Sequence, residues 1–223
     1  MSLQLRASHN GRLLQRLHSA AALRTSFGGT GCSRIVLFVG MAGAGKTAAS
    51  QLYLQTLNLP RLIVELQPGH NQGWAVLHQA FRSQGLPASN LAEALAAITN
   101  PMVLMIDRLE VGLTEDGTFT AAVQSWLPSL LRHPLLHVVL ASRVFPTDPT
   151  ITALTGAGEV LLVDGADLAF RPAEIQALWV DRQGQALDSP RAELLYEACG
   201  GLAALVALAC TLHWTPPQPR PPL

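Results

Sequence analysis

The feature that most constrains the fold of this chain is the segment at residues 40–47, Gly-Met-Ala-Gly-Ala-Gly-Lys-Thr. It matches the pattern G-x-x-x-x-G-K-[ST] at every required position. A short apolar run at residues 35–39 leads directly into it and predicts a strand, and residues 46–57 predict a helix that ends near Pro60. Because a loop that binds nucleotide phosphates requires this strand–loop–helix context, the segment predicts a nucleoside triphosphate site.

Composition singles out one residue of this segment. The 15 basic residues of the chain are fourteen arginines and a single lysine, Lys46. Lysine presents a compact ammonium that acts on phosphate as a point charge, whereas arginine is a broad planar fork. The placement of the only lysine at the one position where the motif requires it makes a chance match a poor alternative.

The roles expected in this loop follow from its backbone and its polar side chains. Backbone N–H groups at the helix N-terminus are expected to wrap the phosphates of ATP or ADP, and Gly43 and Gly45 allow the tight path. Lys46 is expected to contact the β- and γ-phosphates, and the Thr47 hydroxyl to bind Mg²⁺. The predicted nucleotide-binding residues are Gly40, Met41, Ala42, Gly43, Ala44, Gly45, Lys46, Thr47 and Ala48.

A second candidate residue ends another predicted strand. The apolar run at residues 102–107 ends in Asp107, which suits an aspartate that holds Mg²⁺ through its water shell. The alternative is an ordinary strand-end aspartate that caps a turn. Many hydrolytic P-loop proteins have a second acid directly after this aspartate, which positions the attacking water. In this chain that position is Arg108, and the next acid is Glu110. This departure predicts slow or absent hydrolysis, so an ATPase activity stays open.

Arg143 is the third candidate. It is the last residue of the predicted strand at residues 135–143, which we expect beside the strand of the phosphate loop. From that position an arginine can reach a γ-phosphate and report its presence, so Arg143 joins Lys46 and Asp107 as a candidate catalytic residue. The alternative is a surface arginine in a salt bridge. Glu65, at the end of the second predicted strand, receives no role.

The order of predicted elements indicates an α/β fold with a five-stranded parallel sheet flanked by helices and followed by a small all-helical subdomain. We expect a nucleotide-binding domain at residues 1–165, a helical subdomain at 166–214 and a proline-rich tail or linker at 215–223. A helix is also expected around residues 13–17. The predicted strands are 35–39, 62–66, 102–107, 135–143 and 159–163, and the predicted helices are 46–57, 72–84, 91–98, 118–131 with a break or kink at Pro128, 172–182, 190–199 and 201–213.

Composition bounds the setting in which the chain works. Apolar residues make up 49% and charged residues 13%, which reflects either an alanine- and leucine-rich genome or surfaces that meet other domains. No apolar run approaches the roughly 20 residues of a membrane-spanning helix, and the run at residues 201–210 predicts a buried helix. The three cysteines, Cys32, Cys199 and Cys210, show no metal-ligand spacing, which indicates reduced thiols in a cytoplasmic protein.

Charge is unevenly distributed although the net charge is zero. No acidic residue precedes Glu65, while six arginines and Lys46 do. A positive field around a polyanionic nucleotide explains this imbalance. An organellar transit segment and direct contact with nucleic acid are weaker alternatives, because the arginines are dispersed and the early segment has a helical pattern.

These residues together resemble the STAND class, the signal-transduction ATPases with numerous domains. The pattern is most similar to the NTPase module of MalT-like, LuxR-type bacterial transcriptional regulators, and the resemblance covers about residues 10–213. Besides the loop and the Asp107 strand, it includes Val-Val-Leu-Ala-Ser-Arg at 138–143 and Leu-Ala-Phe-Arg-Pro-Ala-Glu at 168–174, like the family's Leu-x-Phe-x-x-x-Glu. It also includes residues 199–209, like the family's Gly-Trp-Pro-Ala-Ala-Leu helix.

The resemblance implies an ATP-dependent, AAA+-like switch in signal transduction and transcriptional regulation. In the family, ADP is held in a closed state, and an inducer with ATP opens the protein into an active oligomer. Residues 40–47 would then bind phosphates, Asp107 would handle Mg²⁺ and Arg143 would sense the γ-phosphate. The family's proline after the glycine of the base-contacting element is absent from Gly201-Leu202-Ala203. The family's winged helix, helical-repeat sensor and DNA-binding helix-turn-helix do not follow Leu223 in this sequence. We therefore expect either that this chain is a piece of a larger regulator or that those parts lie on a partner chain.

Two other function classes stay open. A small P-loop metabolic enzyme of the kinase type fits the length, but no arginine-rich lid follows Asp107, and phosphate transfer to a small acceptor would favour it. A degenerate nucleotide-binding module that serves as an interaction surface is favoured by Arg108 and Ala203. In each case the expected ligand is a nucleotide, any action on DNA is indirect, and no membrane partner is expected.

Overall fold

The computed structural model describes residues 34–69, 73–87 and 89–214. Of these, a sheet unit contains residues 34–41 and 46–164, and a helical unit contains residues 165–214 together with the loop segment Ala42–Gly45. The predicted helix around residues 13–17, the proline-rich tail and Cys32 lie outside the described residues. In the described ranges, no helix is both long and apolar enough to cross a membrane.

The sheet unit is built on five parallel strands in the order β2-β3-β4-β1-β5. Ile35 at the start of β1 pairs with Val138 on one side and with Val160 on the other. The central strands β1, β3 and β4 are buried almost throughout, as expected for strands covered on both faces, whereas the edge strand β2 alternates between buried and exposed residues. The chain therefore has the predicted α/β P-loop NTPase fold. The strands are β1 (Ile35–Val39), β2 (Arg61–Glu65), β3 (Met102–Asp107), β4 (Leu136–Ser142) and β5 (Val160–Val163).

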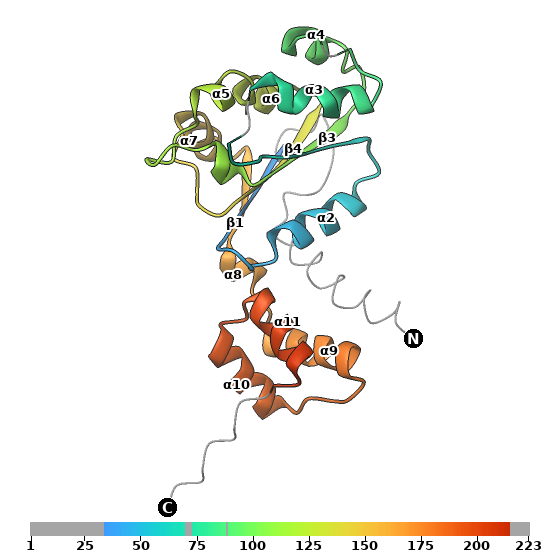
Figure 1. Ribbon diagram of the computed structural model, residues 1–223, viewed down its shortest axis with the longest axis vertical. Coiled ribbons are helices and arrows are strands. Elements are labelled where there is room, and N and C mark those ends of the chain that lie inside the picture. Colours follow the sequence, from blue (N-terminus) through green and yellow to red (C-terminus); the bar gives the residue numbers. More distant parts are fainter. Residues whose placement is uncertain (1–33, 70–72, 88, 215–223) are drawn as a thin grey trace, which may run out of the picture. The chain divides into compact units, whose positions relative to one another are not determined.

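Helices cover both faces of this sheet (Figure 1). One face packs against α2 (Lys46–Thr56), which contributes buried Ala49, Tyr53 and Leu54. The opposite face packs against the other helices of the unit. The glycine loop connects β1 to α2, the helix on the first face. Those helices are α3 (Trp74–Ser83), α4 (Leu91–Ala96), α5 (Ala121–Gln124), α6 (Leu127–Arg132) and α7 (Pro149–Gly156), with the 3₁₀ turn η1 (Leu109–Gly112).

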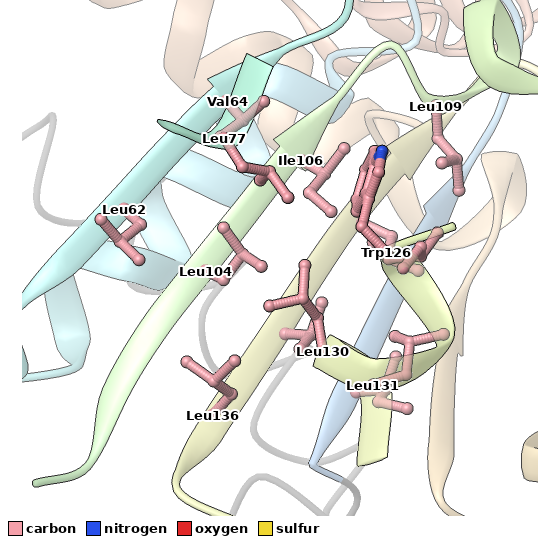
Figure 2. Packing of buried hydrophobic residues seen from close by; sticks show 14 of the residues in the cluster. Leu62, Val64, Leu77, Leu104, Ile106, Leu109, Trp126, Leu130, Leu131 and Leu136 are labelled. Atoms are coloured by element: carbon pink, nitrogen blue, oxygen red, sulfur yellow. The ribbon is translucent and has the colours of Figure 1, made fainter. Parts of the chain in front are cut away.

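The main apolar core lies between the sheet and this second group of helices. Figure 2 shows part of the layer, with Leu62 and Val64 from β2, Leu104 and Ile106 from β3, and Leu130 and Leu131 from α6. Trp126, between α5 and α6, has 1% of its surface exposed and is the largest fully buried side chain among the described residues. Burying a side chain of this size contributes roughly 3 kcal/mol, so the core fixes the strands whose ends carry the candidate site.

The helix predicted at residues 118–131 is two helices. The break falls at Ser125 and Trp126, ahead of Pro128, rather than at the proline. Pro128 occupies the first turn of α6, where its missing N–H would be unpaired in any case. The buried Trp126 makes the turn between the two helices, so packing rather than proline places the break. Three short elements were not predicted at all, namely η1, α7 and α8 (Gly165–Leu168).

The helical unit has a small core of its own. Helices α9 (Pro172–Gln183), α10 (Ser189–Cys199) and α11 (Ala203–Leu212) enclose Ile175, Leu195 and Val206. Gly201, between α10 and α11, has a φ of 71°. A Cβ atom there would lie 2.3 Å from the Phe170 carbonyl oxygen, and the Phe170 N–H donates to the Gly201 carbonyl at 2.8 Å. A glycine is therefore required at this turn for packing.

Helix α11 is only half buried, so the prediction of a buried helix at residues 201–210 is wrong. Val206, Ala209 and Cys210 face the core, whereas Leu205, Leu208 and Leu212 are exposed at helical spacing. The continuous apolar sequence hides this division, because both faces of the helix carry apolar residues. A groove of about 230 Å³ runs along the exposed face, lined by Leu195, Ala198, Cys199, Leu205, Leu208, Ala209, Leu212 and Trp214. Cys199 and Cys210 are free thiols.

Candidate functional site

The candidate residues of the sheet unit gather where three neighbouring strands end. Strands β3, β4 and β1 are adjacent and parallel, so their carboxyl ends lie at one edge of the sheet. The Gly40 N–H donates to the Ser142 carbonyl at 3.2 Å, which joins the end of β1 to the end of β4. Ligands of open parallel sheets bind at this edge, and the neighbouring position of β4 and β1 is as predicted.

The glycine loop has the backbone that its sequence predicts. Gly43 and Gly45 have φ angles of 82° and 88°, in the left-handed region that residues with a side chain rarely adopt. The loop leads into the first residue of α2, which is Lys46. The first turn of α2 contains no acidic residue, so no side chain of that turn neutralises the positive end of the helix dipole. This arrangement favours an anion at the loop.

Lys46 turns back over its own loop. Its Nζ donates to the carbonyl oxygen of Gly40 at 2.6 Å and to that of Met41 at 3.0 Å. Burial lowers the pKa of Lys46, the nearby carboxylates of Glu110 and Asp107 act to raise it, and the Arg143 guanidinium acts to lower it. The ammonium therefore lies within the electrostatic reach of all three groups. A phosphate arriving here would replace the loop carbonyls as the partner of a lysine that is already in place.

Thr47 and Asp107, the two predicted Mg²⁺ ligands, contact each other. The Thr47 hydroxyl donates to Oδ2 of Asp107 at 2.9 Å, and the Arg108 N–H donates to Oδ1 at 2.8 Å. One hydroxyl and one carboxylate fit Mg²⁺, which keeps several waters and takes few protein ligands beside a phosphate. The described residues contain no group of three or more His, Cys, Asp or Glu side chains that could hold a metal ion alone. Thr47 and Asp107 would therefore hold Mg²⁺ together with a nucleotide, whose charge the ion neutralises.

Arg108 occupies the position of the missing second acid, and its side chain is engaged elsewhere. Its guanidinium lies 3.3 Å from a carboxylate oxygen of Glu65 and donates to the side-chain oxygen of Gln67 at 3.3 Å. Its backbone is left-handed, with φ 58° and ψ 42°. Residues with a Cβ pay roughly 1–2 kcal/mol for this conformation. Arg108 thus ties the end of β3 to the end of β2, while the chain turns sharply into η1.

Arg143 is paired with an acid. Its Nε lies 3.1 Å from Oε1 of Glu110, and its backbone N–H donates to Oε2 of the same carboxylate at 3.1 Å. The Glu110 side chain is 17% exposed and that of Arg143 is 56% exposed. The salt bridge that the sequence analysis gave as the alternative for Arg143 is therefore present. The acid in it is Glu110, the first acid after Asp107 in the chain.

Glu110, like Glu65, is an acid of this region to which the sequence analysis assigned no role. It lies in η1, three residues after Asp107, and its carboxylate pairs with Arg143 at the end of β4. That spacing, from a strand-end aspartate to the next acid, is the signal that could have identified it. The arrangement brings Lys46, Asp107, Glu110 and Arg143 into one electrostatic cluster.

The chain has a distant structural likeness to a solved protein. No protein-family model matches the chain, and no curated protein matches it. Among solved structures, it is similar to the RuvB Holliday junction branch migration motor of Thermotoga maritima, with a TM-score of 0.49 and 14% sequence identity. The match covers 92% of this chain and 60% of that one, so the chain spans less than two thirds of that structure.

Proposed function

We propose that this chain is the nucleotide-binding module of a signal-transduction ATPase, which binds ADP or ATP with Mg²⁺ and acts as a slowly hydrolysing switch. In this proposal Lys46 and the loop hold the phosphates, Thr47 and Asp107 hold Mg²⁺, and Arg143 senses the γ-phosphate. The module works in the cytoplasm and acts on transcription only through other domains or partners.

The observation that carries the proposal is the contact between Thr47 and Asp107. The two residues lie 60 positions apart in the chain, and their oxygens are 2.9 Å apart beside the one lysine. If the match to the loop motif were due to chance, nothing would be expected to bring the carboxylate of Asp107 into contact with Thr47. The uncompensated start of α2 supports an anion at the same place.

A degenerate module is the second candidate, and Arg108 favours it. The acid expected after Asp107 is replaced by a cation that pairs with Glu65. A module of this kind would hold a nucleotide, or would serve as an interaction surface, without responding to the γ-phosphate. The two candidates differ in whether ATP and ADP produce different conformations.

Isothermal titration calorimetry of the intact chain with MgADP and MgATP tests binding. We expect both nucleotides to bind, and no measurable affinity for either would contradict both the switch and the nucleotide-holding form of the second candidate. Limited proteolysis with ADP and with a non-hydrolysable ATP analogue then tests the switch. Different cleavage patterns support it, whereas identical patterns with saturating ligand favour the degenerate module.

A further inference from the structure

Strand β2 forms one border of the sheet, and among the described residues it pairs with β3 alone. The Pro60 carbonyl, just before β2, and the Leu66 N–H, just after it, both bond to the backbone of β3. Backbone groups alternate between the two sides of a strand, so the N–H and C=O groups of Arg61, Ile63 and Glu65 are directed away from β3. An outer edge of this kind is a template for another strand.

The same three residues carry the exposed side chains of β2. Leu62 and Val64 are buried, whereas Arg61, Ile63 and Glu65 are exposed. Ile63 has 57% of its surface exposed, and the Glu65 side chain has 54%. Charged side chains at an edge normally discourage pairing, but here a β-branched apolar residue stands open between them. The edge is therefore charged at its ends and apolar at its centre.

The order cation, isoleucine, anion is complementary to itself in one register. When two copies of β2 run antiparallel about Ile63, Arg61 of each copy lies directly opposite Glu65 of the other. Facing residues whose backbone groups point at each other exchange both N–H···O bonds, so the three facing pairs make six hydrogen bonds. Parallel pairing in register would place like charges side by side, and an antiparallel shift by two residues would place a charge against Ile63. Opposite charges that face each other stabilise a strand pair, and like charges destabilise it.

Both charged side chains are available for this pairing. Arg108 contacts Oε1 of Glu65 at 3.3 Å, and the half-exposed carboxylate has a second oxygen for another cation. The Arg61 guanidinium donates a long hydrogen bond, 3.5 Å, to the Leu57 carbonyl, so little is lost when it turns to a new acceptor. Each Glu65 would then lie between Arg108 of its own chain and Arg61 of the other.

We propose that the outer edge of β2 docks a second copy of this chain, so that two sheets join through an antiparallel β2–β2 pair centred on Ile63. The pair uses the same surface on both copies, which is the isologous contact of a two-fold dimer. This inference goes beyond the proposed function, because it requires no nucleotide.

The surface beside the edge provides further contact area. A hollow of about 490 Å³ lies between β2 and α3, and its α3 side includes the small side chains of Ala75, Ala80 and Ser83. In the two-fold pair the α3 helices of the two copies lie on the same face of the joined sheet, and small side chains allow them to approach closely. A pair of five-residue strands buries little area by itself, whereas a stable complex buries roughly 800 Å² per partner. The α3 contact adds to the strand pair.

Sedimentation equilibrium of two charge-reversal variants tests the pairing. Arg61→Glu creates an edge with two acids and Glu65→Arg an edge with two cations, so each alone should have a dissociation constant for the dimer raised about tenfold or more over the wild type. An equimolar mixture of the two variants should restore the dimer, because every facing pair again joins a cation to an anion. Glu115→Arg, which reverses an exposed acid outside β2, is the matched control and should dimerise as the wild type does.

Cross-linking tests the register. In the proposed pair the two Ile63 Cα atoms are about 5.5 Å apart, a separation that a disulfide spans. On oxidation Ile63→Cys should form a dimer linked at that position, as mapped by mass spectrometry. Arg61→Cys should not link to itself, but it should link to Glu65→Cys when the two variants are mixed.

Each outcome decides for or against the dimer. A wild-type chain that stays monomeric at its highest soluble concentration would overturn the inference, and so would a mixture of the charge variants that stays monomeric. Self-linking of Arg61→Cys would overturn the antiparallel register. Ile63→Pro removes only an outward N–H, which an edge strand tolerates, and it should be a folded monomer in thermal melts and sedimentation. A wild-type dimer that binds no nucleotide would contradict the proposed function and support this inference.

Discussion

The Tyr53 hydroxyl, on α2, and Nε2 of His137, on β4, lie 2.8 Å apart and share a buried hydrogen bond. Burial lowers the pKa of His137 from 6.5 to about 4. As the pH falls below 6.5, His137 binds a proton in the unfolded chain but stays neutral in the folded chain until about pH 4. The free energy of unfolding therefore decreases between pH 6.5 and about pH 4. The expected loss between pH 7.5 and pH 5 is roughly 2 kcal/mol, and urea unfolding at the two pH values measures it.

Two variants identify His137 as the source of this loss. His137→Gln should flatten the dependence of the unfolding free energy on pH across that window. Tyr53→Phe should lower stability at every pH but keep the slope, because burial rather than the hydroxyl is the cause of the lowered pKa. An unchanged slope in His137→Gln would assign the pH dependence to other groups.

Lys46→Ala should remove nucleotide binding. The lysine is the cation held over the loop by the Gly40 and Met41 carbonyls, and these oxygens cannot bind phosphate in its place. We expect the affinity for MgATP in calorimetry to fall by about 100-fold or more, since charge-assisted contacts in a partly buried site contribute about 3 kcal/mol. Arg82→Ala, which removes a charge from the last turn of α3, is the control and should bind as the wild type does.

Asp107→Asn should uncouple binding from Mg²⁺. The wild-type chain is expected to bind ATP more tightly with Mg²⁺ than with EDTA, because Thr47 and Asp107 hold the ion against the phosphates. The amide keeps the hydrogen bond from Thr47 but loses the charge that attracts the cation. In calorimetry the ratio of the two affinities should approach one, and a ratio equal to the wild type's would exclude Asp107 from the metal site.

Arg108→Asn should leave the chain as stable as the wild type or make it more stable, by up to about 1 kcal/mol. Asparagine adopts the left-handed conformation more readily than arginine, and the half-exposed ion pair with Glu65 contributes at most about 1 kcal/mol. Urea unfolding measures the difference. The same substitution in a helix, Arg82→Asn, should lower stability because asparagine is a poorer helix former. A loss at position 108 larger than that at position 82 would show that the contacts of Arg108 outweigh its strain.

Two substitutions on α11 test which face carries the fold of the helical unit. Val206 is fully buried and Leu208 is 51% exposed. Val206→Ala should therefore lower the unfolding free energy by about 2 kcal/mol, whereas Leu208→Ala should change it by less than about 0.5 kcal/mol. Comparable losses at the two positions would mean that the exposed face is covered in solution.

The sheet could be predicted from the sequence because its signals are local. Each strand is a short apolar run bounded by glycine, proline or polar residues, and all five appear within one residue of their expected starts and ends. Helix α7 could not be predicted in this way, because the segment that forms it contains three β-branched threonines that are poor helix formers. The sequence does indicate where the helix begins, because Asp148 caps it and Pro149 occupies its first turn.

The residues of the candidate site also differ in how far local sequence signals specify them. The loop, Thr47 and Asp107 are specified by motif and strand position, so a sequence places them without knowledge of distant contacts. The partner of Arg143 is not specified in this way, because Glu110 lies 33 residues earlier and reaches it only through the 3₁₀ turn. The left-handed backbone of Arg108 is also invisible in the sequence, since arginine carries no preference for it.

The exposed face of α11 brings with it an optical consequence. Trp214 lines the groove and is 45% exposed, whereas Trp126 and Trp179 are 1% and 7% exposed. A soluble quencher such as iodide therefore reaches Trp214 far more readily than either buried indole. Any molecule that occupies the groove should shield this tryptophan and shift its emission to the blue, so the chain reports on the state of its own apolar surface without a label.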